Sequence, residues 1–431
     1  MALTRRAALV ALAGVFVVFI APLDGWMILF TEGALAVGVV VDLVLAGSVR
    51  MLEVSRYGDT SRRLDEPTTT GVTVVNRGGR RVRGVLRDAW PPSARARPTR
   101  QRIDVPAGER RRLTTALRPS RRTELPAAQV TVRSVGPLGL AARQGNHEAP
   151  WSVRVLPAFP SRKHLPEKLA NLRLLDGRTA ARVRGQGTEF DSLRDYVEGD
   201  DARSIDWRAT ARRSAIAVRT WRPERDRRLL LVLDTGRTCA ARIGDSTRLD
   251  AAIDAALLLG TLASKAGDRV DVMAADDQAR LLVHASEGGN SLAALLRSMA
   301  GLQPNLVETD GRRLAAEVLR HERHRALVVL FTTLDEAAID EGLLPVLPSL
   351  TARHVVMLAA VTDPHVLAMA GDVADTRGAY DAAAAERTLA AQRRVGGLLR
   401  RLGVDVVEGA PEEFASKVAD AYLSLKSAGR L

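Results

Sequence analysis

The sequence predicts a multidomain protein with an N-terminal two-helix transmembrane hairpin, a small β-sandwich and a C-terminal doubly wound α/β domain. Two long apolar runs open the chain, short alternating runs between turn residues follow, and continuous apolar runs alternate with helical patterns thereafter. At 431 residues the chain is long enough for two or three domains. The predicted boundaries are 1–50 for the hairpin, 51–159 for the sandwich, 160–226 for a connector and 227–431 for the α/β domain.

Two apolar runs at the start of the chain predict two transmembrane helices. Residues 7–23 form the first run and residues 27–47 form the second. A bilayer core needs about 20 apolar residues per helix. A cleaved signal peptide is the alternative, but no clear Ala-x-Ala site follows the first run and a second run comes at once. We therefore favour a two-pass hairpin.

Basic residues flank the outer ends of this hairpin and predict its orientation. Arg5 and Arg6 precede the first run, Arg50 and Arg56 follow the second, and the loop between them carries no basic residue. The positive-inside tendency places both ends, and with them the soluble body, on the cytoplasmic side of the plasma (inner) membrane.

Two acids interrupt the second apolar run. Glu32 is expected near the outer interface, whereas Asp42 lies deeper in the run. Acids inside a membrane are costly and invite a functional hypothesis. For Asp42 we consider pairing with another subunit or a protonated state.

The region 51–159 has the pattern of an antiparallel β-sandwich. Short runs alternate apolar and polar residues, and clusters of Asn, Gly and Pro separate them at a spacing typical of sandwiches. The clearest runs are 71–75, 82–86 and 129–133. The segment 161–187 is polar and basic and is expected to be a connector that is partly helical.

From residue 228 the pattern alternates strand and helix. Continuous apolar strands between helices indicate a mostly parallel sheet that is covered on both faces. The predicted strands are 229–233, 270–273, 281–284, 326–331, 355–360 and 404–407, and the predicted helices are 248–266, 292–299, 312–319, 382–402 and 412–425. Ligands of such sheets bind at the carboxyl ends of the strands, which directs attention to 234–238, 332–335 and the loop near Thr309.

Composition restricts the function further. The formal net charge is +13, which fits nucleic acid, an anionic membrane surface or acidic partners, but no nucleic-acid-binding motif is present and none is expected. The single cysteine, Cys239, cannot form an internal disulfide and is expected to be a small buried residue rather than a nucleophile. His321 and His324 are expected to be a surface pair, because no third metal ligand is evident.

The stretch 188–212 is the most distinctive part of the chain, because it alternates charges around a glycine turn and two aromatic residues. One hypothesis is an inter-domain clasp, in which Trp207 and Ile205 are buried and the acids pair with arginines. The other is a docking surface for a partner. We favour the clasp and do not expect acid–base catalysis here. Its candidate residues are Arg194, Tyr196, Asp200, Arg203, Asp206, Trp207 and Arg212.

These residues carry a resemblance to a known family. The pattern Arg194-Asp-Tyr196…Gly199-Asp200…Arg203-Ser-Ile-Asp206-Trp207…Thr210-Ala-Arg212, supported by Tyr422-Leu…Lys426…Gly429-Arg-Leu431 at the end, resembles the bacterial membrane family known as domain of unknown function 58. The resemblance covers nearly the whole chain, and the α/β region resembles a von Willebrand factor A-like domain. It implies association with a MoxR-type AAA+ ATPase and a chaperone-like role.

The same resemblance implies an adhesion-type metal site. Gly236 replaces the first serine of the family's Asp-x-Ser-x-Ser loop, and Thr333 stands where an acid usually follows the fourth strand. Two hypotheses remain: a Mg²⁺ site, or a degenerate site that keeps the fold and the interaction surface without the ion. The candidate ligands are Asp234, Thr238, Thr309 and Asp335.

Together these features predict a non-enzymatic, membrane-anchored interaction or adaptor protein that works with a MoxR-type AAA+ ATPase to assemble or activate client proteins. A metal-dependent hydrolase with Asp234 and Asp335 as ligands is one alternative, but it needs a nucleophile or general base that the sequence does not reveal. A basic scaffold that binds anionic lipids without an ATPase partner is another. No cofactor other than Mg²⁺ is expected.

Overall fold

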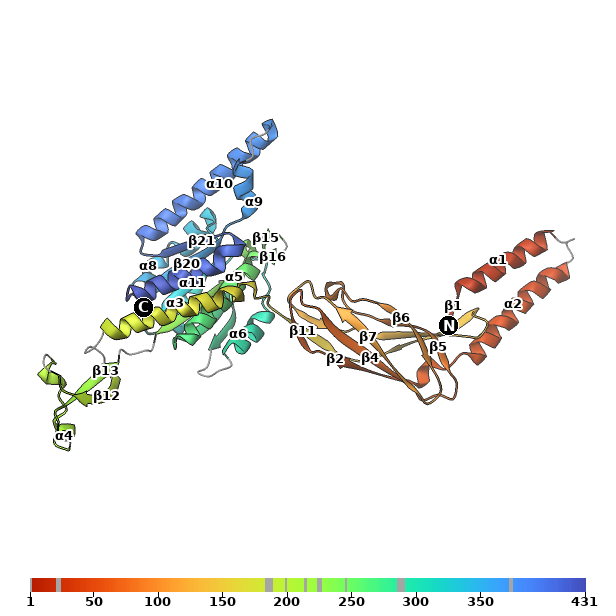
Figure 1. Cartoon of the computed structure of the whole chain (residues 1–431). Coiled ribbons are helices and arrows are strands. Elements are labelled where there is room, and N and C mark those ends of the chain that lie inside the picture. Colours follow the sequence, from red (N-terminus) through yellow and green to blue (C-terminus); the bar gives the residue numbers. More distant parts are fainter. Residues whose placement is uncertain are drawn as a thin grey trace. The chain divides into compact units, whose positions relative to one another are not determined.

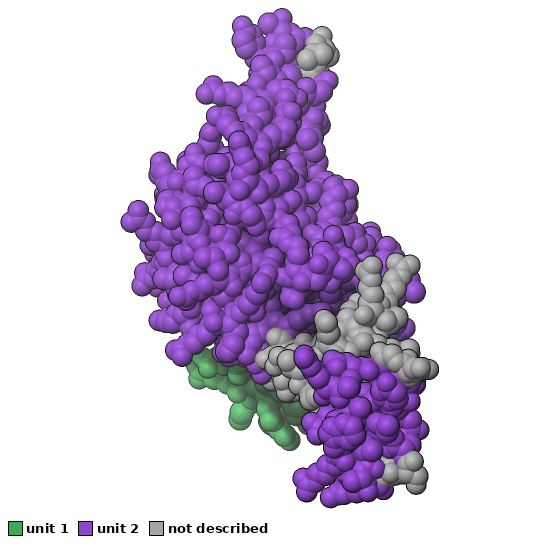
Figure 2. Space-filling model, turned by 90° about the vertical axis from the view of Figure 1, so that its left-hand side faces the viewer, with its two compact units in different colours: residues 1–156 green, residues 157–431 purple. Residues whose placement is uncertain are grey.

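The computed structural model describes residues 2–20, 25–182, 189–197, 200–212, 215–222, 227–244, 246–284, 291–371 and 375–431. The chain is a mixed α/β, multidomain protein with two compact units, residues 1–156 and 157–431, coloured green and purple in Figure 2. The first unit contains the residues for which a hairpin and a β-sandwich are predicted, and the second contains residues 157–431, which include the predicted connector and α/β region.

Two apolar helices open the first unit. They are α1 (Arg5–Ile20) and α2 (Gly25–Leu45), and they contact each other (Figure 1). Within the described residues, one helical stretch, Ile28–Met51, is long and apolar enough to cross a membrane, with a mean hydropathy of 2.1. This N-terminal stretch is therefore a candidate membrane anchor or signal sequence.

Three sheets form the rest of the first unit. Apolar side chains from β4, β5, β6 and β9 point into one buried cluster, as the alternating runs predict. One sheet runs β1 (Ala2–Leu3), β10 (Ala141–His147), β9 (Val130–Val135), β5 (Val82–Asp88) and β6 (Arg100–Val105). The others run β2 (Leu52–Gly58), β4 (Thr68–Asn76) and β7 (Arg110–Leu117), and β3 (Ser61–Arg63), β11 (Ser152–Leu156) and β8 (Glu124–Pro126).

Asp42 joins α2 to these sheets. It is fully buried, and its carboxylate accepts hydrogen bonds from the backbone N–H groups of Leu138, Leu140 and Ala141, at 2.7 Å for Leu138 and 3.0 Å for Ala141. Gly136 leaves room for this carboxylate, because a Cβ at that position would collide with it. Pairing with another subunit or protonation in lipid is not needed to explain Asp42, since amides of the same chain satisfy it.

Arg56 also differs from its predicted role as a residue that flanks the membrane. Its side chain is 1% exposed and forms an ion pair with Asp88 at 2.9 Å. The guanidinium also lies over the ring of Trp90, 5.3 Å from its centroid. Burial lowers the pKa of Arg56, and Asp88 opposes that shift. Arg56 therefore belongs to the interior of the β-region.

A six-stranded sheet is the centre of the second unit. Its order is β18 (Ala279–His284), β17 (Arg269–Ala275), β14 (Arg228–Asp234), β19 (Leu327–Phe331), β20 (Val355–Val361) and β21 (Asp405–Gly409). All neighbouring pairs are parallel except β17 with β18. Counted along the chain, this is the order 3-2-1-4-5-6 of a doubly wound sheet.

Helices cover both faces of this sheet, because its strands bury alternate side chains on opposite sides. Leu231 and Leu233 face a cluster with α3 (Leu165–Arg182), α5 (Arg248–Lys265), α6 (Ser291–Ala300) and α11 (Pro411–Ser427). Leu230 and Val232 face a cluster with α7 (Gly311–His321), α8 (Leu347–Thr351) and α10 (Thr376–Arg401). The helix α9 (Pro364–Gly371) contacts α10, and β15 (Arg242–Ile243) pairs with β16 (Ser246–Thr247) before α5.

The first part of the predicted connector contains a packed helix, α3. In α3, Leu172 is 3% exposed within the core, and Lys168 binds Asp420 of α11 at 2.7 Å. The helix α3 agrees with the expectation that segment 161–187 is partly helical, and its contacts show that it packs on the second unit.

The distinctive stretch lies in a two-stranded ribbon, here named the arm and defined as the described residues between 189 and 222. Its strands, β12 (Glu189–Asp195) and β13 (Ala217–Arg222), pair antiparallel. The short helix α4 (Trp207–Thr210) lies between them in the chain (Figure 1). Thr188 and Gly199 of the predicted stretch lie outside the described residues.

Candidate functional site

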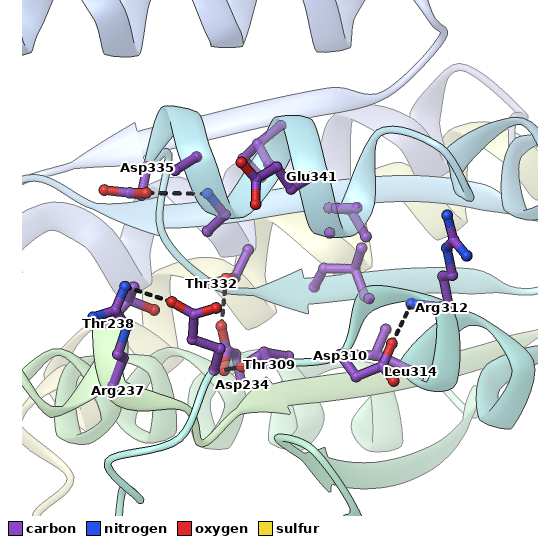
Figure 3. A pocket seen from close by; sticks show the side chains of 18 of the residues that line it. Asp234, Arg237, Thr238, Thr309, Asp310, Arg312, Leu314, Thr332, Asp335 and Glu341 are labelled. Carbon is purple, nitrogen blue, oxygen red and sulfur yellow. Dashed lines mark hydrogen bonds and ion pairs between the residues drawn. The ribbon is translucent and has the colours of Figure 1, made fainter.

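A cavity of about 310 Å³ opens at the carboxyl ends of β14 and β19 (Figure 3). These two strands flank the point where the strand order of the sheet reverses, which is where doubly wound sheets bind their ligands. Apolar side chains from β14, β19 and α7 form its inner wall. All four residues predicted as metal ligands line it: Asp234, Thr238, Thr309 and Asp335.

Asp234 is the centre of the polar part of this cavity. It ends β14 and is 5% exposed. Its Oδ1 accepts hydrogen bonds from Thr309 Oγ1 at 2.5 Å and from the Gly236 N–H at 2.8 Å. Its Oδ2 accepts one from Thr332 Oγ1 at 2.6 Å. Neutral donors thus satisfy the buried carboxylate on both oxygens.

Gly236 does more than remove a hydroxyl ligand. A Cβ at this position would collide with Thr309 Oγ1 and would lie 3.1 Å from Asp234 Oδ1. The missing side chain is therefore what lets the Thr309 hydroxyl reach Asp234. The sequence shows that the serine is absent, but it does not show that the Thr309 hydroxyl takes its place beside Asp234, because Thr309 is distant in the chain.

In the loop after β19, Thr332 rather than Asp335 contacts Asp234. Asp335 lines the cavity, but its Oδ1 accepts a hydrogen bond from the Ala338 N–H at 3.1 Å and so caps the helical segment Ala338–Leu343 (Figure 3). Thr332 contacts Asp234 in its place. Thr333, where the family's acid usually stands, is buried. Asp335 thus lines the cavity without contacting Asp234, and its role as a metal ligand stays a prediction.

Asp276, which sequence reasoning missed, positions the loop that carries Thr309. It is 1% exposed and accepts hydrogen bonds from Asn305 Nδ2 at 2.7 Å, Arg280 Nε at 2.8 Å and Thr235 Oγ1 at 3.2 Å. Burial opposes ionisation, but the hydrogen bonds from Arg280 and Asn305 outweigh it and hold the pKa of Asp276 well below its usual range. Its position just after a predicted strand is the signal that indicates it.

The oxygen atoms at this site are of the type that Mg²⁺ prefers, but their positions only partly suit an ion. Hard cations take oxygen ligands, and Asp234, Thr309 and Thr332 offer three side chains with such atoms. However, both hydroxyls are within hydrogen-bonding distance of the carboxylate, and Asp335 is engaged elsewhere. At the mouth, Arg237 pairs with Glu308 at 2.6 Å, and both side chains are exposed.

Cys239 lies beside this cluster but has no nucleophilic character. It is 2% exposed, and burial, followed by the charge of Asp234, raises the pKa of its thiol well above the ordinary value. The thiolate is therefore not populated near neutral pH.

Two ion pairs hold the arm together. Arg194 Nη2 lies 2.5 Å from Asp200 Oδ1, and Arg219 Nε lies 2.8 Å from Asp206 Oδ2. Asp206 also caps α4 by accepting from the Ala209 N–H at 2.9 Å. The hydrogen bond from Arg194 lowers the pKa of Asp200, and those from Ala209 and then Arg219 lower the pKa of Asp206. The predicted pairing of acids with arginines occurs, within the arm itself.

The aromatic residues of the arm are not buried as the clasp hypothesis requires. Trp207 is 68% exposed and Tyr196 is 40% exposed, while Ile205 is half-buried. Arg203 and Arg212 are exposed as well. The predicted burial of Trp207 was wrong, because the short helix α4 presents this side chain to solvent.

The terminal part of the sequence pattern has a structural role. Tyr422 and Lys426 of α11 are buried and both donate hydrogen bonds to Asp268, which precedes β17. A buried carboxylate with a phenol and an ammonium group as partners ties the last helix to the sheet.

The comparisons with known proteins agree with the resemblance stated from the sequence. Residues 192–384 match the model of a family described as "Protein of unknown function DUF58", which confirms the resemblance over that segment. The chain is also similar to uncharacterized proteins of Mycobacterium bovis and Mycobacterium tuberculosis, at 29% identity over 193 residues. That match covers 44% of this chain and 60% of the length of those relatives.

Two solved structures are similar to parts of the chain. The VWA domain of SpRpn10 matches 46% of this chain and 95% of its own, at 10% identity and a TM-score of 0.27. A CARDB domain from Pyrococcus furiosus, crystallised in complex with di-metal ions, matches 24% of this chain and 91% of its own, at 18% identity and a TM-score of 0.18.

Proposed function

We propose that this chain, whose residues 192–384 match the domain of unknown function 58 family, is a non-enzymatic, membrane-anchored adaptor that works with a MoxR-type AAA+ ATPase. In this role it assists the assembly or activation of client proteins. The observation that carries the proposal is the exposure of Trp207 and Tyr196 on the arm. Trp, Tyr and Arg are enriched among the residues that contribute most of the binding energy at protein interfaces.

The arm is also preorganised for binding. Its ion pairs, Arg194 with Asp200 and Arg219 with Asp206, restrain the segment that presents Trp207. A restrained surface loses less conformational entropy when a partner binds, so more of the contact energy appears as affinity.

Binding of the detergent-solubilised full chain to the MoxR-type ATPase of the same organism tests this proposal. Trp207→Ala is expected to weaken binding at least about tenfold, which corresponds to about 1.4 kcal/mol. Tyr380→Ala, which removes an aromatic residue that is 76% exposed on α10, is the matched control and should bind as the parent does. Equal affinity for all three proteins would contradict the proposal. Binding to anionic vesicles without any ATPase binding would favour the lipid-binding scaffold.

The cavity supports a binding role over hydrolysis. A general base must come within hydrogen-bonding reach of the substrate, whereas Asp234 is 5% exposed and three of its roughly four acceptor positions are filled by protein donors. We propose that the cluster is a degenerate adhesion site that keeps its surface without the ion. Calorimetric titration with millimolar Mg²⁺ should give no binding heat. Heat that Asp234→Asn abolishes would establish the ion site instead.

We further propose that α1 and α2 form a two-pass hairpin on a β-sandwich, and that the second unit is a von Willebrand factor A-like domain with its body in the cytoplasm. The residue before α1 and the last part of α2 contact the same loop of the β-region, since Thr4 Oγ1 donates to Leu140 O and Asp42 accepts from Leu140 N–H. This supports placing both ends of the hairpin on one side. A reporter fused after Leu431 that is active only in the periplasm should be silent; activity would reverse the topology.

A further inference from the structure

A second polar cluster lies at the opposite end of α7 from the cavity. Asp271 on β17 and His284 on β18 are directly opposed across the antiparallel pair, and His321 is the last residue of α7. Asp271 Oδ2 lies 3.0 Å from His321 Nε2 and 3.2 Å from His284 Nδ1. One ligand atom from each residue lies within 4.8 Å of the other two. We name these three residues the histidine cluster.

The distances between these side-chain atoms are close to those between neighbouring ligand atoms around a bound Zn²⁺ ion. Zn–N and Zn–O bonds of about 2.0–2.2 Å with tetrahedral angles place neighbouring ligand atoms about 3.4 Å apart. Asp271 Oδ2 already lies within a few tenths of an ångström of that separation from each imidazole. The two imidazole nitrogens lie within 4.8 Å of each other, and the side chain of His284, which is 69% exposed, has room to adjust toward a common centre.

The cluster combines two restrained ligands with one open side. The side chains of His321 and Asp271 are 11% and 12% exposed, so the surrounding protein restricts their conformations. Restrained ligands lose little entropy when they bind an ion. The exposed face beside His284 offers a route for the ion and a position for water as a fourth ligand.

We propose that Asp271, His284 and His321 bind a divalent transition-metal ion, with Zn²⁺ as the probe. Imidazole and carboxylate donors suit Zn²⁺ and other borderline cations, whereas Mg²⁺ prefers oxygen ligands. The site is distinct from the cluster at Asp234, which offers only oxygen atoms from its side chains. It links β17, β18 and the end of α7.

His324 supplies a matched control. It lies three residues after His321, its side chain is 71% exposed, and its Nδ1 is 3.9 Å from Glu322 rather than in the cluster. The sequence favours His321 and His324 as a pair, but the fold directs His321 toward β17 instead. Removing His324 therefore removes an imidazole without removing a proposed ligand.

Zn²⁺ affinity of the untagged, detergent-solubilised full chain tests the site, measured by competition with a chromophoric chelator. The parent and His324→Ala should each bind one equivalent that Mg²⁺ does not displace. His284→Ala should weaken that binding by about 100-fold or more, since even second-shell losses cost about 10–100-fold. Co²⁺ should give the intense visible bands of a four-coordinate N/O site, and His284→Ala should abolish them.

The variant His284→Ala keeps the test interpretable, because this exposed side chain can be removed with less risk to folding than His321. Asp271→Asn provides a second ligand change that preserves volume. Absence of Zn²⁺ binding by the parent, or binding that His284→Ala and Asp271→Asn leave unchanged, would overturn the proposal.

Discussion

A single carboxylate organises the polar part of the cavity in this protein. Asp234 holds the ends of three segments through Gly236, Thr309 and Thr332. Asp234 and Thr309 are identifiable from the sequence because they match a family pattern. The contribution of Thr332 and the engagement of Asp335 are not, because they depend on which side of a buried strand end each side chain faces. At the residue scale, the structure therefore keeps the predicted place of the site and adds Thr332 to the side chains that contact Asp234.

Restoring the serine at position 236 tests this description of the cavity. In Gly236→Ser the new Cβ would displace the Thr309 hydroxyl from Asp234. We expect a loss of about 1–3 kcal/mol in the free energy of unfolding, as for other overpacked sites. Urea unfolding measures it, with Gly301→Ser as control, because a Cβ at Gly301 meets nothing within 4 Å. If the added Thr309→Ala change does not restore part of the lost stability, the proposed competition is incorrect.

For the helices and strands, the sequence predicts the strands of the second unit well, but it does not predict how α3, the arm and Asp42 contact the rest of the protein. Continuous apolar runs locate β14, β19 and β20, since a buried parallel strand has few alternatives. The packing of α3 and the exposure of the arm depend on contacts between distant segments. The same is true of Asp42, whose amide partners lie 96 to 99 residues away.

The junction between α2 and the β-region should depend strongly on Asp42. Asp42→Ala removes the acceptor for three backbone N–H groups. We expect a local loss of at least about 3 kcal/mol, because hydrogen bonds to a charged group contribute about 1.5–3 kcal/mol each. Hydrogen exchange of segment 136–142 should accelerate accordingly. Glu32→Ala, which removes an exposed acid from the same helix, should leave that exchange unchanged; equal acceleration in both variants would refute the assignment.

Asp254 of α5, which is buried against Ser161 in the segment before α3, predicts that the stability of the protein depends on pH. Asp254 accepts hydrogen bonds from the N–H and hydroxyl of Ser161, and burial, which these bonds only partly oppose, raises its pKa from 3.8 to about 6. The native state therefore holds this proton more tightly than the unfolded state does. The contribution of Asp254 to stability falls as pH rises from about 4 to about 6, and the cost persists above that window.

Asp254→Asn should remove this cost while its side-chain oxygen still accepts from Ser161. A shift of roughly 2 pKa units corresponds to about 3 kcal/mol, so the variant should be more stable than the parent by up to that amount at pH 8. The advantage should vanish near pH 3.5. Denaturant unfolding at both pH values checks this, with Asp381→Asn on exposed α10 as control. An advantage that is equal at the two pH values would rule out the titration of Asp254 as its cause.

At the scale of the whole molecule, the sequence predicts a boundary at 159–160, and the two compact units divide between 156 and 157. This boundary is visible because the alternating apolar runs end there and the polar, basic segment 161–187 begins. The role of the arm is harder to predict from the sequence, because a tryptophan among charged residues is compatible with a buried clasp and with a docking surface. Its exposure in the structure is what favours docking.

Site-specific photo-crosslinking would show whether the arm binds the ATPase. A photoreactive phenylalanine analogue in place of Trp207, in the full chain and with the MoxR-type ATPase present, should crosslink to the ATPase. The same analogue in place of Tyr380, which is also exposed, should not. A crosslink from position 380 but not from position 207, or none from position 207 while the complex forms, would contradict the account.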